Sequence, residues 1–141
     1  REAGAMTILN PAPAAELSAE LLSLCDILIP NEHEIELLGG VSKLQEAGVK
    51  TVIVTRGAAG IDIYHEGIGQ RLPSFHVTPV DTTGAGDAFC GSLAASLTAG
   101  HELNDACVRA LAGGALATTT HGAVPSLPFQ DEIESLIAAS S

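Results

Sequence analysis

The sequence predicts an α/β fold, and three observations carry that prediction. Short apolar runs rich in β-branched residues alternate with stretches of helical spacing, an order typical of a sheet covered by helices. The chain has 141 residues, enough for one domain with its own core. It is 46% hydrophobic with a mean hydropathy of +0.32, which is too apolar for a disordered chain. The sequence has no internal repeats or obvious linkers, so we treat 1–141 as one domain.

The first elements are short. Residues 7–9 form an apolar run that ends at 10–13, where two prolines prevent a strand from continuing. Residues 14–24 carry leucines at helical spacing and predict a helix. A second strand is predicted at 26–29, and Pro30 ends it.

The middle of the chain predicts a helix followed by a hairpin. Asn31 can cap a helix whose first turn is acidic, as the helix dipole favours. Residues 51–55 are the clearest buried strand of the sequence. A glycine-containing turn at 57–60 leads into 61–64, which alternates with period two, so this pair of strands predicts a hairpin or a sharp strand-to-strand step.

Three helices are predicted in the second half. A strong helix follows the segment 81–87 and extends to about residue 98, with apolar residues at i, i+4 and i+8. A second helix is predicted from about 104 to 120, and a short one at 130–139.

Composition excludes several classes of function. Six basic residues against 17 acidic ones give a net charge of −11, so phosphate backbones and anionic membrane surfaces would repel the chain. The three cysteines, Cys25, Cys90 and Cys107, lie far apart and are interpreted as small buried hydrophobes in a reducing compartment. Neither a membrane-spanning apolar run nor the apolar core of a signal peptide is present, so a cytoplasmic protein is expected.

The segment 81–87 carries the chemistry. Gly84 and Gly86, directly before a helix, allow a tight turn that leaves N–H groups pointing outward, which makes an anion site at the positive end of the helix. Asp87 lies in the first turn of that helix, where an acid is useful if it takes a proton from a hydroxyl that attacks phosphorus. The alternative is an ordinary first-turn acid beside a plain turn. Neither the dinucleotide-binding nor the Walker pattern matches here.

The segment 81–87, Asp-Thr-Thr-Gly-Ala-Gly-Asp, resembles the C-terminal signature of the ribokinase-like (PfkB) carbohydrate kinases. Other segments resemble motifs of that family and occur in the family's order. Residues 31–34 are similar to its N-x-x-E motif, 55–60 to its nucleotide-binding T-x-G-x-x-G turn, and 121–126 to the turn after its long nucleotide-side helix. Residues 8–13 look more like the ribose kinases of the family than like the family at large.

The resemblance implies a three-layer α/β/α sandwich, of which 1–141 would be the C-terminal, nucleotide-binding and catalytic part, with the family's small β lid absent. It implies ATP-dependent phosphorylation of the primary hydroxyl of a sugar, with ribose to ribose 5-phosphate favoured. The alternatives are a fructokinase-like or other specificity, and a non-catalytic nucleotide-binding or interaction module. Neither the lid nor the family's N-terminal glycine-rich sugar segment lies in these residues. A homodimer of the full-length protein, paired through the lid, stays open.

The resemblance also assigns roles within 81–87. Asp87 would be the catalytic base in contact with the sugar hydroxyl. The backbone N–H groups of Gly84, Ala85 and Gly86 would form an anion hole for the transferred phosphoryl group.

An ATP site is implied as well. Arg56, one of few cations in this acidic chain, lies in the expected nucleotide turn, where it could contact phosphate. Leu111 stands where many family members carry Asn or His near the adenine, so no polar adenine contact is expected from it. The expected ATP-binding residues are Asn31, Thr55, Arg56, Gly57, Ala58, Ala59, Gly60, Gly86, Asp87 and Leu111.

Two metal ions are implied. Glu34 would act on the magnesium–phosphate assembly through water, and the alternative is a plain solvated first-turn acid. A monovalent cation, K⁺, would activate the enzyme and be held mostly by backbone carbonyls. The positions that match its site are Asp81, Thr83, Ala117, Thr120, Gly122 and Ser126.

Two further features need an explanation. Gly113 and Gly114 lie inside a predicted helix, where each costs roughly 0.5–1 kcal/mol relative to Ala. Close helix packing, or a flat wall for the nucleotide base, would justify them. The stretch between Gly40 and Thr51 is shorter than the family's pattern, which has a longer helical segment there.

Overall fold

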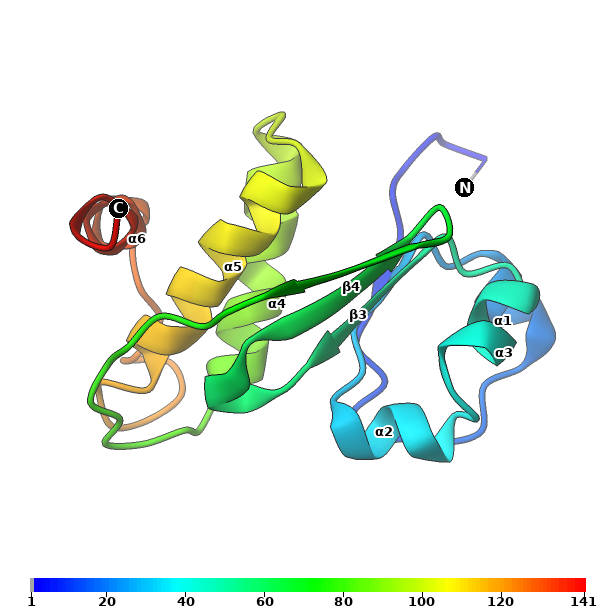
Figure 1. The fold of residues 1–141 in the computed structure, drawn as a ribbon, viewed down its shortest axis with the longest axis horizontal. Helices are drawn as coiled ribbons and strands as arrows, with labels where there is room; N and C mark the ends of the chain where they lie inside the picture. Colours follow the sequence, from blue (N-terminus) through cyan, green and yellow to red (C-terminus); the bar gives the residue numbers. More distant parts are fainter. Residues whose placement is uncertain (1) are drawn as a thin grey trace. The chain divides into compact units, whose positions relative to one another are not determined.

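A computed structural model describes residues 2–141, and the chain divides into two compact units, of which the first ends at Leu72 and the second spans Pro73–Ser141. The first unit contains a five-stranded sheet with short helices (Figure 1). Its strands are β1 (Ile8–Leu9), β2 (Ile27–Leu28), β3 (Thr51–Thr55), β4 (Ile61–His65) and β5 (Ile68–Leu72). Its helices are α1 (Ala19–Ser23), α2 (Glu32–Leu37) and α3 (Val41–Glu46).

The sheet has the order β1-β2-β3-β4-β5 and is mixed. The first three strands are parallel, and the helices lie in the connections between them, because parallel neighbours need a crossover. From β3 onward the pairing is antiparallel, with Thr55 opposite Ile61 where the chain turns. The predicted hairpin is therefore confirmed.

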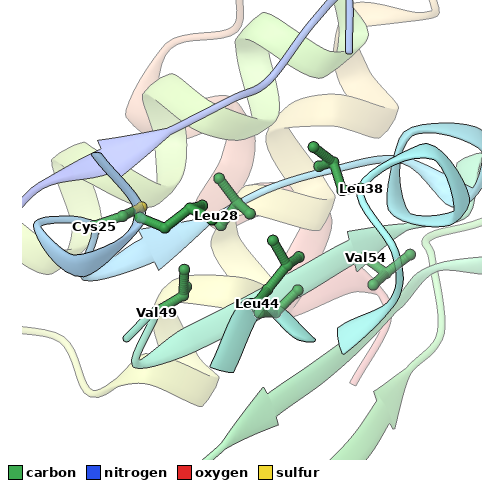
Figure 2. Close-up of a cluster of buried hydrophobic side chains, with 8 residues drawn as sticks. Cys25, Leu28, Leu38, Leu44, Val49 and Val54 are labelled. Carbon is green, nitrogen blue, oxygen red and sulfur yellow. The ribbon is translucent and has the colours of Figure 1, made fainter. Parts of the chain in front are cut away.

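The core of the first unit joins the parallel strands to the helices of their crossovers, and Figure 2 shows this cluster. Val52 and Val54 belong to it, whereas Ile53 between them projects to the opposite side of β3 and is also fully buried. The buried members are Leu22, Cys25, Leu28, Leu38, Leu44, Val49, Val52 and Val54.

Three elements of this unit differ from the prediction. The helix expected over 14–24 is confined to Ala19–Ser23, because Ser18 is extended and its hydroxyl accepts the N–H of Leu21 at 3.2 Å. Helix α3 was not predicted, and its anchor is the buried Leu44. Strand β5 was also not predicted, since its residues are mostly exposed and do not alternate in polarity.

A two-residue turn positions β5 against β4. Glu66 and Gly67 both have positive φ, 50° and 78°, which is the backbone of the tight turns that suit hairpins. Gly67 is the sequence signal that could have identified this hairpin.

The second unit contains the three predicted helices, α4 (Ala85–Thr98), α5 (Leu103–Ala117) and α6 (Gln130–Ala139). Helices α4 and α5 pack side by side (Figure 1). A Cβ atom at Gly113 would overlap Ser92 Oγ, and one at Gly114 would lie 3.3 Å from the carbonyl oxygen of Ala85. Close helix packing thus accounts for both glycines.

The cysteines follow the prediction in two cases of three. Cys25 and Cys107 are buried, and burial raises the pKa of the Cys107 thiol to about 12. Cys90 is only half-buried. Within residues 2–141, none of the helices has the length and apolar character needed to cross a bilayer.

Candidate functional site

The predicted site residues fall into two groups, one in each unit, and we describe each group by itself. The β3–β4 turn (Arg56–Gly60) and the N-terminus of α2 belong to the first unit. The glycine loop (Asp81–Asp87) and the turn after α5 belong to the second.

Asn31 and Thr55 meet at the carboxyl edge of the parallel strands. Asn31 follows β2, Thr55 ends β3, and the two residues form an isolated parallel bridge. The N–H of Thr55 donates to the carbonyl of Pro30 at 2.9 Å. Open α/β sheets bind ligands beyond the carboxyl ends of their strands, so this is the expected edge for a ligand.

Glu34 is fixed at the same edge by a reciprocal pair of hydrogen bonds. Its N–H donates to Asn31 Oδ1 at 2.8 Å, and its Oε2 accepts the N–H of Asn31 at 2.8 Å. This capping box leaves Glu34 only 7% exposed. The alternative of a solvated first-turn acid is therefore wrong, and the role toward magnesium stays a prediction.

The β3–β4 turn is closed by its own backbone. The N–H of Arg56 donates to Gly60 O at 2.9 Å, and the N–H of Ala59 donates back to Arg56 O at 3.0 Å. A 3₁₀ turn, η1 (Gly57–Ala59), lies between them, and Gly57 and Gly60 have φ of 55° and 96°. Both glycines are needed because side chains disfavour positive φ.

The Arg56 side chain is held by two carboxylates. Its Nε donates to Asp62 Oδ2 at 2.6 Å, and its Nη1 donates to Glu32 Oε2 at 2.7 Å. Asp62 also accepts from Arg71, at 2.6 Å from Nε to Oδ1. The hydrogen bond from Arg71, followed by that from Arg56, holds the pKa of Asp62 below its usual range.

Asp62, Glu32 and Arg71 were not identified from the sequence. The only signal for Asp62 was a lone carboxylate inside an otherwise apolar, alternating strand. Such a residue needs a partner when buried, but the sequence alone does not say which one.

In the second unit, Gly84 begins α4 with φ of 79°, in the left-handed region. A Cβ atom there would lie 3.2 Å from the Cα of Ala123, so any side chain would both strain the backbone and press on Ala123. The N–H of Ala85 donates to Thr82 O at 3.2 Å, and the first-turn N–H groups of a helix have no acceptor within it. Asp87 lies exposed in this turn, as predicted.

Asp81 ties the glycine loop to the turn after α5. Its Oδ1 accepts the N–H of Thr83 and its Oδ2 the N–H of Gly122, both at 2.9 Å. The N–H of Val80 donates to Thr118 O at 2.7 Å. The hydrogen bond from Gly122, together with those from Thr83, lowers the pKa of Asp81 to about 2.

The residues predicted to hold K⁺ are thus partly brought together. The Asp81 carboxylate accepts the N–H groups of both Thr83 and Gly122. Thr120, two residues before Gly122, is exposed. Ser126 is buried and its hydroxyl donates to Ala123 O at 2.8 Å. Among residues 2–141, no three His, Cys, Asp or Glu side chains gather to hold a metal ion, which leaves a site of backbone carbonyls untested.

Two predicted residues lie inside α5. Ala117 is buried at its last position, and Leu111 is 5% exposed. The role of Leu111 near the adenine stays a prediction.

The family described as "pfkB family carbohydrate kinase" matches residues 1–130. The chain belongs to that family. A ribokinase of Staphylococcus aureus (strain COL) is 37% identical over 143 residues, covering 92% of this chain and 47% of that protein. A ribokinase of Haemophilus influenzae is 38% identical over 141 residues, covering 92% and 46%. Fructokinase-1 of Zea mays is 35% identical, covering 97% and 50%.

Solved structures agree. The ribokinase of Thermotoga maritima has a TM-score of 0.91 and 35% identity, over 96% of this chain and 50% of that one. A putative ribokinase II of E. coli in complex with ATP and Mg²⁺ has a TM-score of 0.80 and 36% identity, over 86% and 42%. The predicted ribokinase-like α/β fold is confirmed. The chain spans about half the length of the relatives it matches.

Proposed function

We propose that residues 1–141 are the nucleotide-binding and catalytic part of an ATP-dependent sugar kinase that phosphorylates a primary hydroxyl, with ribose as the favoured sugar. The observation that carries the proposal is the start of α4, where a left-handed Gly84 and an exposed Asp87 share one helix N-terminus. The helix dipole alone would favour an acid at this position. The match of 81–87 to the family's signature, together with an anion site at the same helix N-terminus, is what supports proton transfer by Asp87.

In this mechanism Asp87 accepts the proton of the sugar hydroxyl while that oxygen forms a bond to the γ-phosphorus of ATP. The bond from phosphorus to the leaving ADP oxygen breaks, and the N–H groups of Gly84 and Gly86 stabilise the charge on the phosphoryl group. The N–H of Ala85 donates to Thr82 O and instead holds the loop in shape. Asn31 and the β3–β4 turn line the nucleotide site. The complex of the E. coli relative with ATP and Mg²⁺ supports ATP as the donor.

Magnesium would neutralise phosphate charge, and it commonly keeps several waters and one or two carboxylates. Glu34 fits that role through water, because the capping box fixes its orientation at the carboxyl edge of the strands. K⁺ would lie between the glycine loop and the turn after α5, where it balances the Asp81 charge.

Replacement of the base tests the proposal. In the natural protein, with whatever sequence flanks these residues, Asp87→Asn and Asp87→Ala should lower kcat at least ~10²-fold and leave the KM for ATP nearly unchanged. Asp131→Asn is the matched control, since Asp131 is an exposed first-turn acid on α6. If Asp87→Asn kept near-wild-type turnover, the base assignment would be wrong.

The substrate is tested by kcat/KM for ribose against fructose. We expect ribose to be preferred, and a preference for fructose would assign the specificity suggested by the maize relative.

Activity should also rise when K⁺ replaces a large organic cation at constant ionic strength. A flat response would remove the monovalent cation from the proposal.

A further inference from the structure

Asp62 occupies the centre of an ion-pair network that no step above uses. It faces Arg71 across the β4–β5 ladder, where the two residues are direct cross-strand partners. Its two oxygens accept three hydrogen bonds from the guanidinium groups of Arg71 and Arg56, at 2.6, 3.1 and 2.6 Å. The Asp62 side chain is only 8% exposed. Such charge-assisted, two-armed contacts are both strong and directional.

Arg56 connects this buried carboxylate to the predicted nucleotide site. It is the first residue of the β3–β4 turn, and its guanidinium also reaches Glu32, in the first turn of α2. Glu32 directly follows Asn31, which forms the bridge with Thr55. One side chain therefore ties the turn to the N-terminus of α2.

The two carboxylates around Arg56 differ in burial. The Glu32 side chain is 58% exposed, and exposed ion pairs contribute little. Asp62 is buried and held from both sides, so it fixes the Nε edge of Arg56 against β4. This geometry also occupies two edges of the guanidinium with protein carboxylates.

We propose that Asp62 is a positioning residue for nucleotide binding: it holds Arg56, and through Arg56 the β3–β4 turn, in place beside the N-terminus of α2. Arg56 then acts as a tie within the protein, in contrast to the phosphate contact considered from the sequence. This inference rests on the proposed function, because it requires nucleotide to bind at the turn.

Steady-state kinetics with ATP and sugar in the natural protein test the inference. Asp62→Asn keeps the shape of the side chain and removes its charge. We expect the KM for MgATP to rise about tenfold, as for a broken contact in a coupled network, with kcat and the KM for sugar within about twofold of wild type. Arg56→Gln should act alike, and it leaves Asp62 paired with Arg71 should Asp62→Asn fail to fold.

A double variant and binding of adenosine distinguish the two roles of Arg56, a tie within the protein or a ligand of phosphate. If Arg56 is a tie, the effects of Asp62→Asn and Arg56→Gln on the KM for MgATP are non-additive, and each variant weakens adenosine binding as much as MgATP binding. If Arg56→Gln weakens MgATP but not adenosine, Arg56 is a phosphate ligand and the inference is wrong.

Asp26→Asn is the matched control for stability. Asp26 precedes β2 at the amino ends of the strands, and its carboxylate accepts the N–H of Thr7 at 2.9 Å and pairs with Lys50 at 2.8 Å. It should lower thermal stability without changing the KM for MgATP. An equal rise in KM for Asp26→Asn, or an unchanged KM for both Asp62→Asn and Arg56→Gln, overturns the inference and leaves the kinase standing. A wild type without phosphoryl transfer from ATP overturns both.

Discussion

Each of the two groups of candidate site residues contains a glycine turn, and the chain holds these two turns in different ways. The β3–β4 turn closes on its own backbone, and the Arg56 side chain ties it to Asp62 and Glu32. The glycine loop is tied to the turn after α5 by the Asp81 carboxylate, which accepts the N–H of Gly122, and by the close approach of Gly84 to Ala123.

The two turns also differ in the space around their glycines, which predicts where a larger residue is tolerated. A Cβ atom at Gly57 would meet nothing within 4 Å, although its φ is positive. At Gly84 the φ is positive too, and a Cβ atom there would also lie within 3.2 Å of the Cα and the Cβ of Ala123. A methyl group should therefore be tolerated better at Gly57 in the β3–β4 turn than at Gly84 in the glycine loop.

The largest expected effect comes from adding that volume. Gly84→Ala should lower kcat by about 10²–10³-fold, because the anion-hole N–H groups move when the loop is displaced from Ala123. Gly57→Ala costs only backbone strain, of order 1 kcal/mol or somewhat more. Measuring kcat and thermal unfolding of both variants tests the contrast, and equal losses of kcat would remove it.

The sequence predicted the glycine loop better than the β3–β4 turn, for a physical reason. The spacing of Gly84 and Asp87 is local, so the chain itself contains the helix start and the acid. The ties of Arg56 depend on the pairing of β4 with β5, a strand whose exposed residues carry no pattern. The packing of Gly113 was likewise one of two explanations until the position of Ser92 was known.

The next effect concerns the contact of α5 with α4, the helix that follows the glycine loop. Gly113→Ala would drive a methyl group into Ser92 on α4, and overpacking of this kind typically costs about 1–3 kcal/mol. Gly114→Ala should cost less, because its nearest neighbour, the carbonyl oxygen of Ala85, lies at 3.3 Å. Denaturant unfolding measures both, and Ser92→Ala should restore part of the loss in Gly113→Ala. Without any such restoration, the close approach of α4 and α5 would not be the cause.

Acid should weaken the glycine loop in a defined range. The Asp81 pKa is lowered from 3.8 to about 2, so its carboxylate stabilises the fold fully above about pH 4 and loses that contribution as pH falls towards 2. Asp81→Asn should remove this part of the pH dependence. Thermal unfolding from pH 5 to pH 2 measures it, and identical profiles for the variant and the wild type would contradict the assignment.

The smallest expected effect concerns the exposed ion pair of Arg56 with Glu32. Glu32→Gln removes the exposed partner of Arg56 and keeps the buried one, so the KM for MgATP should change by less than about threefold and Tm by less than about 2 °C. Added salt should erase even this difference, because solvent ions screen exposed pairs over roughly 3 Å at 1 M. Asp62→Asn should keep most of its effect at the same salt, since the Asp62 carboxylate is itself buried and is held by guanidinium groups from two sides. If salt erased the difference from wild type for both variants, the turn would be held by exposed ion pairs alone. The buried carboxylate of Asp62 would then not position it.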